Sequence, residues 1–185
     1  MKVLGISGSL RAASINSALL RAAQRLAPPE IELTIYQGVG DLPLFNPDLE
    51  ASLPESVRAL HAAVAAADAL LIASPEYAHG VTGAIKNTLD WLVSFEPFVH
   101  KHVAVLNASP RAHYADEALR ETLKTMSAVI VEEASISIPL LGAKLADEGM
   151  VQDAAVSAAI RGALASLHDA VVRGLQPQGP ASPLP

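Results

Sequence analysis

Short apolar runs recur along this chain, separated by longer segments in which polar residues are frequent. The runs are rich in Val, Leu, Ile and Ala, a composition typical of strands buried on both faces of a parallel sheet. Between them, apolar residues return at the spacing of amphipathic helices. The predicted strands are Val3–Ile6, Ile31–Tyr36, Ala69–Ala73, Val103–Leu106 and Val129–Val131. The predicted helices are Asn16–Leu26, Pro54–Ala66, Gly83–Phe95, Asp116–Met126 and about Met150–Arg173.

Alternation of strands and helices indicates an α/β protein with a five-stranded parallel sheet covered by helices on both faces. In such open sheets, ligands bind beyond the carboxyl ends of the strands, where the strand order reverses. For the order 2-1-3-4-5, this crevice lies between the first and third strands. The loops 7–16 and 74–82 should therefore meet there, and the loop 107–114 should edge the same crevice.

The chain has 185 residues, of which 51% are hydrophobic, enough for one globular domain with a real core. We expect this domain to span residues 1–174. Residues 175–185 contain four prolines and cannot continue a helix, so we expect a disordered tail there.

Charge and composition exclude several classes of function. The net charge of −6 argues against nucleic acid or an anionic membrane surface as a partner and favours a small molecule. Cysteine is absent, which excludes disulfides, thiolate metal sites and a cysteine nucleophile, and the scattered histidines predict no metal site. No apolar run approaches the ~20 residues of a membrane span, and no export signal is recognised, so we expect a cytoplasmic protein.

The loop after the first strand, Ser7–Asn16, combines small and hydroxyl residues with a single arginine and leads directly into a helix. A helix N-terminus offers unpaired N–H groups and a partial positive charge, which stabilise an anion. Ser9, Ser14 and Asn16 add side-chain donors, and Arg11 adds a planar fork that suits two phosphate oxygens. The pattern predicts a phosphate-binding loop.

A simpler interpretation of this loop is structural. Ser14 or Asn16 would then only cap the helix, and Gly8 would only permit a tight turn. The loop contains neither a Walker A sequence nor Gly-x-Gly-x-x-Gly, so it is not a P-loop or a standard dinucleotide fingerprint.

The loop after the third strand predicts a second part of the same site. Pro75 imposes an extended entry, and Tyr77 offers an aromatic face with a polar tip, so the loop could hold a flat heteroaromatic ring. Alternatively, its Pro and Gly residues only shape the connection between two elements, and Tyr77 is a half-buried packing residue. A phosphate at one loop and a flat ring at the other would describe a nucleotide.

Three motifs carry a family resemblance: Gly8-Ser9-Leu10-Arg11-x-x-Ser14-x-Asn16, then Leu42-Pro43-Leu44-Phe45-Asn46, then Pro75-Glu76-Tyr77 followed by Gly83-x-x-Lys86-Asn87-x-x-Asp90-Trp91. At this spacing the chain, from the first strand to about residue 140, resembles the NAD(P)H-dependent FMN reductases. That family, which includes quinone, chromate and azo-dye reductases, implies a flavodoxin-like three-layer fold.

The resemblance also implies a set of cofactor-binding residues. The FMN phosphate would be held by Ser9, Arg11, Ser14, Ile15 and Asn16. The isoalloxazine edge would be held by Pro75, Glu76, Tyr77 and Ala78, with Ser109 and Arg111 near the ribityl chain and ring.

These loops differ from the family pattern at two places. Family members often have Asn where this chain has Ala78, and a glycine-rich loop where it has 109–113. The first could remove one side-chain contact to the flavin, and the second puts acceptor and nicotinamide specificity in question.

The resemblance implies an FMN-dependent NAD(P)H:acceptor oxidoreductase that works by ping-pong hydride transfer through FMN, with no catalytic acid–base residue required. Two alternatives stay open: a flavodoxin-like electron carrier, and a flavin-binding module without turnover. The sequence does not decide the acceptor or the choice between NADH and NADPH, although Arg111 could select the 2′-phosphate of NADPH.

The predicted helix Gly83–Phe95 suggests a subunit contact. Ile85, Leu89 and Leu92 form one apolar stripe that can face the sheet, whereas Trp91, Phe95 and then Phe98 point elsewhere. We therefore expect a homodimer, or a tetramer built from two dimers, which agrees with the dimers of the family. The alternative is that a neighbouring loop of the same chain covers the second apolar face.

Overall fold

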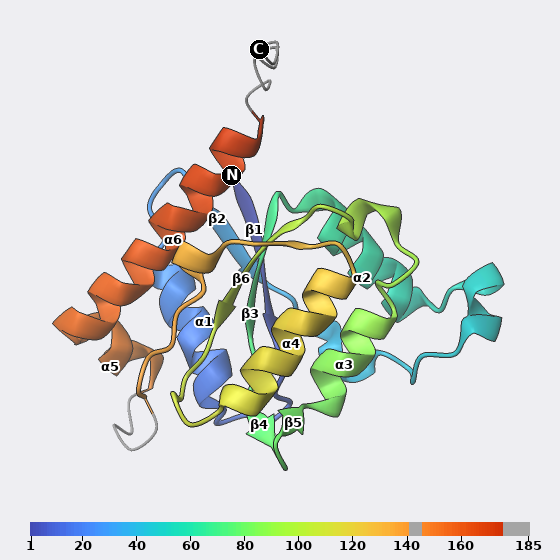
Figure 1. The fold of residues 1–185 in the computed structure, drawn as a ribbon, viewed down its shortest axis with the longest axis horizontal. Coiled ribbons are helices and arrows are strands. Elements are labelled where there is room, and N and C mark those ends of the chain that lie inside the picture. Colours follow the sequence, from blue (N-terminus) through green and yellow to red (C-terminus); the bar gives the residue numbers. More distant parts are fainter. Residues whose placement is uncertain (141–145, 176–185) are drawn as a thin grey trace, which may run out of the picture.

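The computed structural model describes residues 1–140 and 146–175. Its central element is a parallel five-stranded sheet with the strand order β2-β1-β3-β6-β7 (Figure 1). The strands are β1 (Lys2–Ser7), β2 (Glu32–Ile35), β3 (Ala69–Ala73), β6 (His102–Leu106) and β7 (Val129–Ile130). Counted along the sheet's own strands, this is the predicted order 2-1-3-4-5, so the predicted fold class is confirmed.

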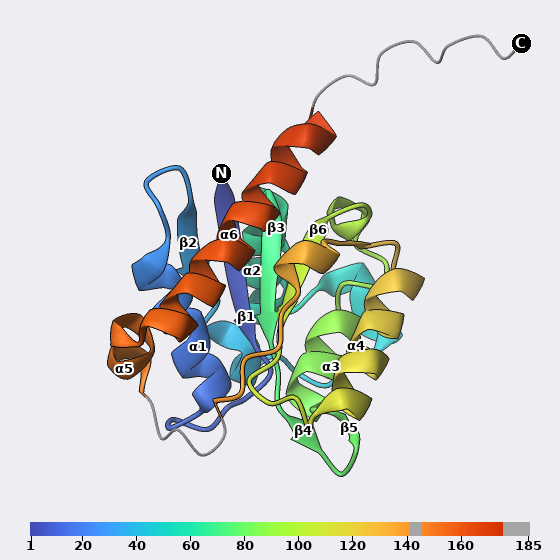
Figure 2. The same ribbon diagram turned by 60° about the vertical axis from the view of Figure 1, so that its left-hand side comes forward.

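Helices cover both faces of the sheet and make a three-layer structure (Figures 1 and 2). One face carries α1 (Ile15–Leu26), α5 (Asp147–Gln152) and α6 (Ala154–Leu175). The other carries α2 (Glu55–Ala66), α3 (Gly83–Asp90) and α4 (His113–Thr125). The connections include the short 3-10 helices η1 (Gly38–Asp41), η2 (Pro47–Ser52), η3 (Glu96–Phe98) and η4 (Glu132–Ala134).

The strands divide their side chains between two cores because successive residues point to opposite faces. In β3, Leu71 packs into the core beneath α1 and α6, whereas Leu70 and Ile72 pack into the core beneath α2, α3 and α4. Each of the three side chains is at most 1% exposed. Burying such a side chain stabilises the fold by about 1.5–3 kcal/mol, which explains why the strands read as continuous apolar runs.

The predicted helix Gly83–Phe95 is wrong at its C-terminal end, because α3 ends at Asp90. The chain then turns toward η3, and Trp91 and Phe98 are each only 1% exposed within the core on that face. The indole N–H of Trp91 donates to the carbonyl of Pro43 at 2.8 Å. Phe95 is half-buried against the same core and stacks on His61 with ring centroids 4.0 Å apart. The three aromatic residues therefore pack inside the chain, so the argument that they form a subunit contact is wrong and the alternative, cover by the same chain, is confirmed.

Two further corrections concern helix ends. The helix expected from Asp116 begins at His113, so the third loop ends at Ala112 rather than Tyr114. The long helix expected from about Met150 is divided into α5 and α6. Asp153 causes the break, since its Oδ1 accepts hydrogen bonds from the N–H groups of Ala155 and Val156 at 3.0 and 2.9 Å.

The outer strand β7 is short, and beyond its end the hydroxyl of Ser135 links the chain to β6. Ser135 Oγ accepts from the N–H of Val105 at 3.0 Å and donates to the carbonyl of Val131 at 2.8 Å. The chain then returns to β6 through a parallel bridge between Asn107 and Ser137. This return keeps the loop after β6 anchored at the carboxyl end of the sheet.

Helix α6 is long and apolar enough to cross a membrane when judged by length and composition alone, contrary to the expectation that no segment approaches this length. In the structure it packs on the sheet, with Ile160, Leu164 and Leu167 each at most 1% exposed in the core shared with α1. One face of α6 thus packs on the α/β domain, while 28% of its apolar segment is buried. Its last residue is Leu175, and the remainder of the expected tail, 176–185, lies outside the described residues.

His102, at the start of β6, should make stability depend on pH. Burial, together with the neighbouring Lys101, lowers the pKa of His102 from 6.5. Below that pH the unfolded chain takes up the proton more readily than the folded chain, so the free energy of unfolding should fall as pH drops through this range. Urea unfolding at pH 7.5 and 5.5 should show this loss. The loss should shrink in His102→Gln, and an equal loss in that variant would assign it to other groups.

Candidate functional site

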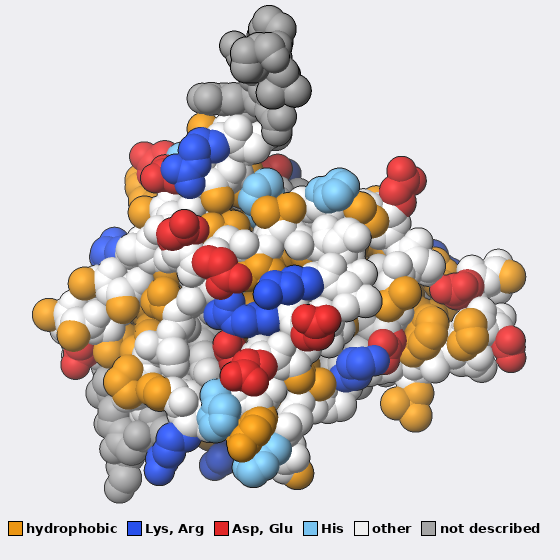
Figure 3. Space-filling view, in the orientation of Figure 1, with side chains coloured by type: hydrophobic (Ala, Val, Ile, Leu, Met, Phe, Trp, Pro, Cys, Tyr) orange, Lys and Arg blue, Asp and Glu red, His pale blue; other side chains and the backbone are white. Residues whose placement is uncertain are grey.

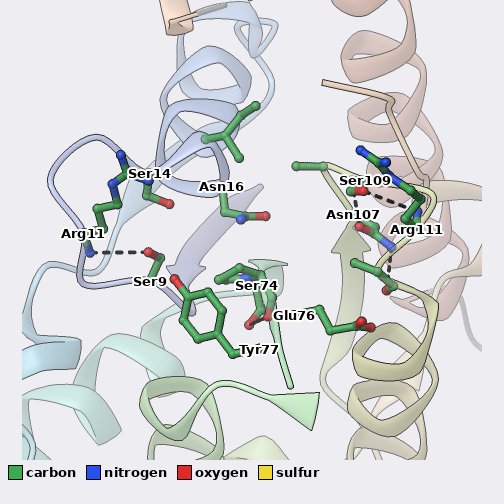
Figure 4. Close-up of a pocket in the computed structure, with 14 residues that line it drawn as sticks. Ser9, Arg11, Ser14, Asn16, Ser74, Glu76, Tyr77, Asn107, Ser109 and Arg111 are labelled. Carbon is green, nitrogen blue, oxygen red and sulfur yellow. Dashed lines mark hydrogen bonds between the residues drawn. The ribbon is translucent and has the colours of Figure 1, made fainter. Parts of the chain in front are cut away.

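The three predicted loops meet at the carboxyl end of the sheet and enclose a pocket of about 330 Å³ (Figure 4). Of the predicted site residues, all but Ala78 line it. Those that line it are Ser9, Arg11, Ser14, Ile15, Asn16, Pro75, Glu76, Tyr77, Ser109 and Arg111. Sequence reasoning missed four further lining residues, Ser74, Asn107, Ala108 and Ala112. Ser74, Asn107 and Ala108 follow directly on β3 and β6, and this position is the signal that could have found them, whereas Ala112 precedes α4 and carries no such signal.

The first two loops are held together at Gly8. A Cβ atom on Gly8 would lie only 2.1 Å from Ser74 Oγ and 2.6 Å from Ser74 Cβ. The Gly8 N–H donates to the carbonyl of Ala73 at 2.8 Å, and its carbonyl accepts from the buried Thr82 hydroxyl at 2.6 Å. Gly8 is thus required for close approach between the loops.

The loop before α1 leaves several donors free for a ligand. Ser14 Oγ caps the helix by accepting from the Ser17 N–H at 3.3 Å, so the capping interpretation is correct for Ser14. Its hydroxyl proton is still available. Among the described residues, the backbone N–H groups of Ile15 and Asn16 have no partner. Together with the exposed guanidinium of Arg11, these donors can bind an anion.

Asn16 shows most directly that the pocket suits a polar ligand. Asn16 is 4% exposed, and its Oδ1 is a buried acceptor without a hydrogen-bond partner in the described part of the chain. Its side chain projects into the pocket between the first and third loops (Figure 4). A buried polar atom left unpaired costs about 1–3 kcal/mol, so a bound hydroxyl or amide donor would remove a real penalty.

The third loop is built around Asn107. Its Oδ1 accepts from the Ser109 N–H at 2.9 Å, and its Nδ2 donates to the carbonyl of Ala112 at 3.2 Å. Ser109 Oγ accepts from the Arg111 N–H at 3.3 Å. This bonding turns the loop across the end of β6 and places Arg111 on the side of the pocket opposite Arg11 (Figure 4).

Glu76 joins the second loop to the N-terminus of α4. Its Oε2 accepts from the backbone N–H of Ala115 at 2.9 Å, and no side chain of α4's own cap residue, Ala112, supplies this bond. A carboxylate at a helix N-terminus is also favoured by the helix dipole. Glu76 thereby positions the loop, while its half-buried side chain still lines the pocket.

A hairpin at the mouth of the pocket explains why Ala78 does not line it. Sequence reasoning missed this hairpin, in which β4 (Glu76–Tyr77) pairs with β5 (Gly80–Val81). The two residues at its tip, Ala78 and His79, have φ values of 49° and 58°. A two-residue turn with both φ values positive is a type I′ turn, which prefers Asn-Gly. The tip directs Ala78 outward and leaves Tyr77 59% exposed at the rim.

Ala78→Asn should therefore stabilise the protein. Alanine in the left-handed region is strained by about 1–2 kcal/mol, and asparagine tolerates that region better. We expect the free energy of unfolding to rise by about 0.5–1 kcal/mol, measured by urea denaturation. Ala78→Val is the matched control and should destabilise, because a β-branched residue fits this region worst. A stabilising valine would contradict the role of φ.

The rim beside this hairpin is aromatic. The ring of His79 stacks on Tyr114 with centroids 4.4 Å apart, and His113 lies against the same tyrosine at 4.1 Å. The stack connects the hairpin tip to the first turn of α4. These contacts give both histidines a packing role at the entrance.

Fold and pocket define a flavodoxin-like α/β protein with a pocket at the carboxyl end of its sheet, where ligands bind in such folds. Comparison with known proteins identifies the family. The sequence model for NADPH-dependent FMN reductase matches residues 1–140. The chain therefore belongs to the NADPH-dependent FMN reductase family, which confirms the resemblance read from its motifs.

Individual relatives agree with this assignment. An NAD(P)H-dependent FMN reductase of Pseudomonas aeruginosa is 42% identical over 132 residues, which cover 66% of this chain and 69% of that protein. A quinone reductase of Escherichia coli K12 is 33% identical over 113 residues, 59% of this chain and 60% of that protein. The solved flavoenzyme NAD(P)H:(acceptor) oxidoreductase FerB from Paracoccus denitrificans superposes with a TM-score of 0.77 at 28% identity, covering 93% of this chain and 97% of FerB. The family makes this protein an NAD(P)H-dependent flavin oxidoreductase.

Proposed function

We propose that the pocket binds FMN and that the protein passes electrons from NAD(P)H to a small-molecule acceptor such as a quinone. The observation that carries this proposal is the convergence of three loops on one pocket. One part of its lining offers the helix N-terminus and Arg11, and another offers Pro75 and Tyr77. FMN has a charged phosphate and a flat ring, and this lining is complementary to both.

The residues divide into three groups in this proposal. Ser9, Arg11, Ser14 and the N–H groups of Ile15 and Asn16 would hold the phosphate, and Asn16 Oδ1 would accept from a ribityl hydroxyl. Pro75, Glu76 and Tyr77 would lie along the ring. Ser109 and Arg111 would close the opposite side. Ala78 points away from the pocket, so it could contribute only through its backbone.

Bound FMN supplies the chemistry by accepting a hydride from NAD(P)H and delivering electrons to the acceptor. The chain's task is to orient the ring, to exclude water beneath it and to provide donors where negative charge develops. The described lining offers Ser and backbone donors for this purpose, together with Arg111. We assign no catalytic acid or base to the chain.

We also propose a ping-pong order of events, which the shape of the site supports. The loops cover one side of the pocket, whereas its mouth opens beside the exposed Tyr77. Donor and acceptor would use this same opening in turn, so the first product must leave before the second substrate enters. Initial rates with varied NADPH and quinone should then give parallel double-reciprocal lines.

The central experiment is an anaerobic visible spectrum of the FMN-loaded protein before and after adding NADPH or NADH. Bleaching of the flavin band, followed by reoxidation with quinone, is the expected result. A bound flavin that stays oxidised with both donors would instead favour an electron carrier or a binding module without turnover. Failure to bind FMN at all would overturn the site assignment.

We propose that the protein forms a homodimer, or a tetramer of two dimers. Support comes from exposed apolar side chains near the loop that carries η2, which projects from the body of the fold (Figure 1). Leu44 is 84% exposed and Val93 is 61% exposed. Hydrophobic atoms are also visible on the projecting part in the space-filling view (Figure 3). Light scattering should give twice or four times the chain mass, and Leu44→Ser should weaken the assembly.

We also propose a cytoplasmic location. The packing of α6 into the core, rather than as a free apolar helix, supports it. Cell fractionation with antibody detection would test it, and recovery in the membrane fraction would contradict it.

A further inference from the structure

A second cavity, of about 400 Å³, lies on the other side of the phosphate-binding loop. Its walls are that loop, the first half of α1 and the segment that follows β2. Ser9 and Arg11 line both cavities, so the loop separates them. The proposed binding of FMN uses only these two shared residues, and the rest of the far cavity is left without a role.

The lining of this cavity carries positive charge only, although Asp41, which follows the lining Gly40, acts on the Tyr36 hydroxyl from outside the lining. Arg11 and Arg21 both line it, and within the described chain its lining holds no Asp or Glu. Arg21 has one acidic neighbour outside the lining, because its Nε lies 3.5 Å from Asp147 Oδ2 at the start of α5. The Arg21 side chain is 43% exposed, and its guanidinium makes no other ion pair in the described part of the chain. Arg11 is assigned to the FMN phosphate, so Arg21 is the lining cation that remains for a second ligand. In a chain of net charge −6, an arginine facing a cavity without a lining carboxylate indicates an anionic ligand.

The opposite wall is apolar and partly aromatic. This wall is formed by Ile35, Tyr36 and Val39. The side chain of Leu10, from the phosphate-binding loop, lies next to Gly40. Leu10 is 65% exposed, which is unusual for a leucine that lines a cavity. The Tyr36 hydroxyl donates to the carbonyl of Ser56 at 3.2 Å, so its ring is held in place. An anionic group and a flat apolar group could therefore bind side by side.

The position of the cavity narrows the choice of ligand. In dinucleotide-binding α/β folds, the adenosine ribose lies at the carboxyl end of the second strand. An acidic residue there accepts from a free 2′-hydroxyl, whereas an arginine nearby accommodates a 2′-phosphate. In this chain the loop after β1 lacks the dinucleotide fingerprint and is assigned to the FMN phosphate, so only the place beyond β2 is compared, and NADPH would pass over that loop to reach the flavin. Here β2 ends at Ile35 and is followed by Tyr36 and Gln37, both of which line the cavity. Gln37 is neutral, and an acidic residue at the same position would repel a phosphate.

We propose that this second cavity binds the 2′-phosphoadenosine end of NADPH, with Arg21 on the 2′-phosphate, and so makes NADPH the preferred donor. The inference rests on the proposed function and extends it to donor selection. The proposal assigns recognition of the 2′-phosphate to Arg21 on α1 and no longer to Arg111, which lines the flavin pocket.

The first test is a pair of variants on different elements. Arg21→Gln removes the cation, and Gln37→Glu places a carboxylate in the cavity at nearly constant size. Each should raise the KM for NADPH about tenfold while leaving the KM for NADH and the FMN content unchanged. Equal changes with both donors, or no change, would overturn the proposal. So would loss of the NADPH preference in Arg111→Ala alone.

Asp147→Asn is the matched control, because it breaks the same ion pair but keeps the Arg21 cation. It should leave the preference for NADPH intact or increase it. If Asp147→Asn lowers the preference as Arg21→Gln does, the effect belongs to the packing of α5 and the proposal is wrong.

Direct binding separates this proposal from the proposed function. Calorimetry with 2′,5′-ADP on the FMN-loaded protein requires no turnover. Binding should be detected in the parent protein and weakened about tenfold in Arg21→Gln, with 5′-AMP binding weakly to both. Absence of 2′,5′-ADP binding would overturn the proposal even if the protein oxidises NADPH, whereas binding without oxidation would overturn only the proposed function.

Discussion

Arg11→Ala is expected to weaken FMN binding by about 10- to 100-fold and to leave riboflavin binding unchanged. The guanidinium is exposed at the pocket lining and is expected to form charge-assisted hydrogen bonds with the phosphate, each worth about 1.5–3 kcal/mol. Riboflavin lacks the phosphate but keeps the ring and the ribityl chain. Fluorescence titration of both flavins against the apoprotein therefore isolates the contribution of the phosphate.

The matched control for this experiment is Arg58→Ala on α2, which removes another exposed arginine that does not line the pocket. It should bind both flavins like the parent protein. If Arg11→Ala weakened FMN and riboflavin equally, the loop would be disturbed rather than the phosphate contact. If neither flavin were affected, the phosphate would bind elsewhere and the assignment of this loop would be wrong.

Gly8→Ala should be the most damaging single substitution at the site. The new Cβ would lie 2.1 Å from Ser74 Oγ, 2.6 Å from Ser74 Cβ and 3.0 Å from Ser74 Cα, so the two loops must separate. We expect the free energy of unfolding to fall by about 2–3 kcal/mol and FMN to be lost during purification. Urea denaturation and the flavin content of the purified protein measure the two effects.

A second substitution tests the cause. Ser74→Gly removes the two closest atoms, so the Gly8→Ala/Ser74→Gly double variant should recover much of the lost stability. Gly83→Ala is the control for replacing a glycine beside the pocket, because its Cβ would meet nothing within 4 Å. It should be neutral or stabilise by up to about 1 kcal/mol. No recovery in the double variant would show that the backbone of the loop, rather than the contact with Ser74, requires glycine.

Much of the site could be predicted from sequence because it follows directly from strand ends. Once Val3–Ile6, Ala69–Ala73 and Val103–Leu106 are recognised as parallel strands, their following loops must meet at one edge of the sheet. Motif spacing then placed Ser9, Arg11 and Tyr77 in those loops. Asn107 and Ser74 were missed although the same rule covers them, because their roles depend on contacts with Ala112, Ser109 and Gly8 that have no local signal.

The sequence-based predictions were wrong or incomplete where contacts between distant segments, and not the local hydrophobic pattern, decide the structure. Trp91 and Phe98 look like a second apolar face of a helix, yet the helix ends at Asp90 and both side chains enter the core. The hairpin at Ala78 and His79 has no Asn-Gly signal, but pairing of Glu76 with Val81 forces the turn. Glu76 itself reads as a flavin contact, whereas the structure also gives it the N–H of Ala115 on another element.

The sequence by itself determined the α/β fold class, the strand order implied by the family motifs and the loops that form the pocket. These features depend on the periodicity of apolar residues and on short motifs, both of which are local. Only the tertiary structure decided how closely Gly8 approaches Ser74, which carboxylate caps α4, and that a second cavity with Arg21 lies beyond the phosphate-binding loop. These depend on the distance between segments far apart in the chain, which packing of the two cores sets and no local pattern encodes.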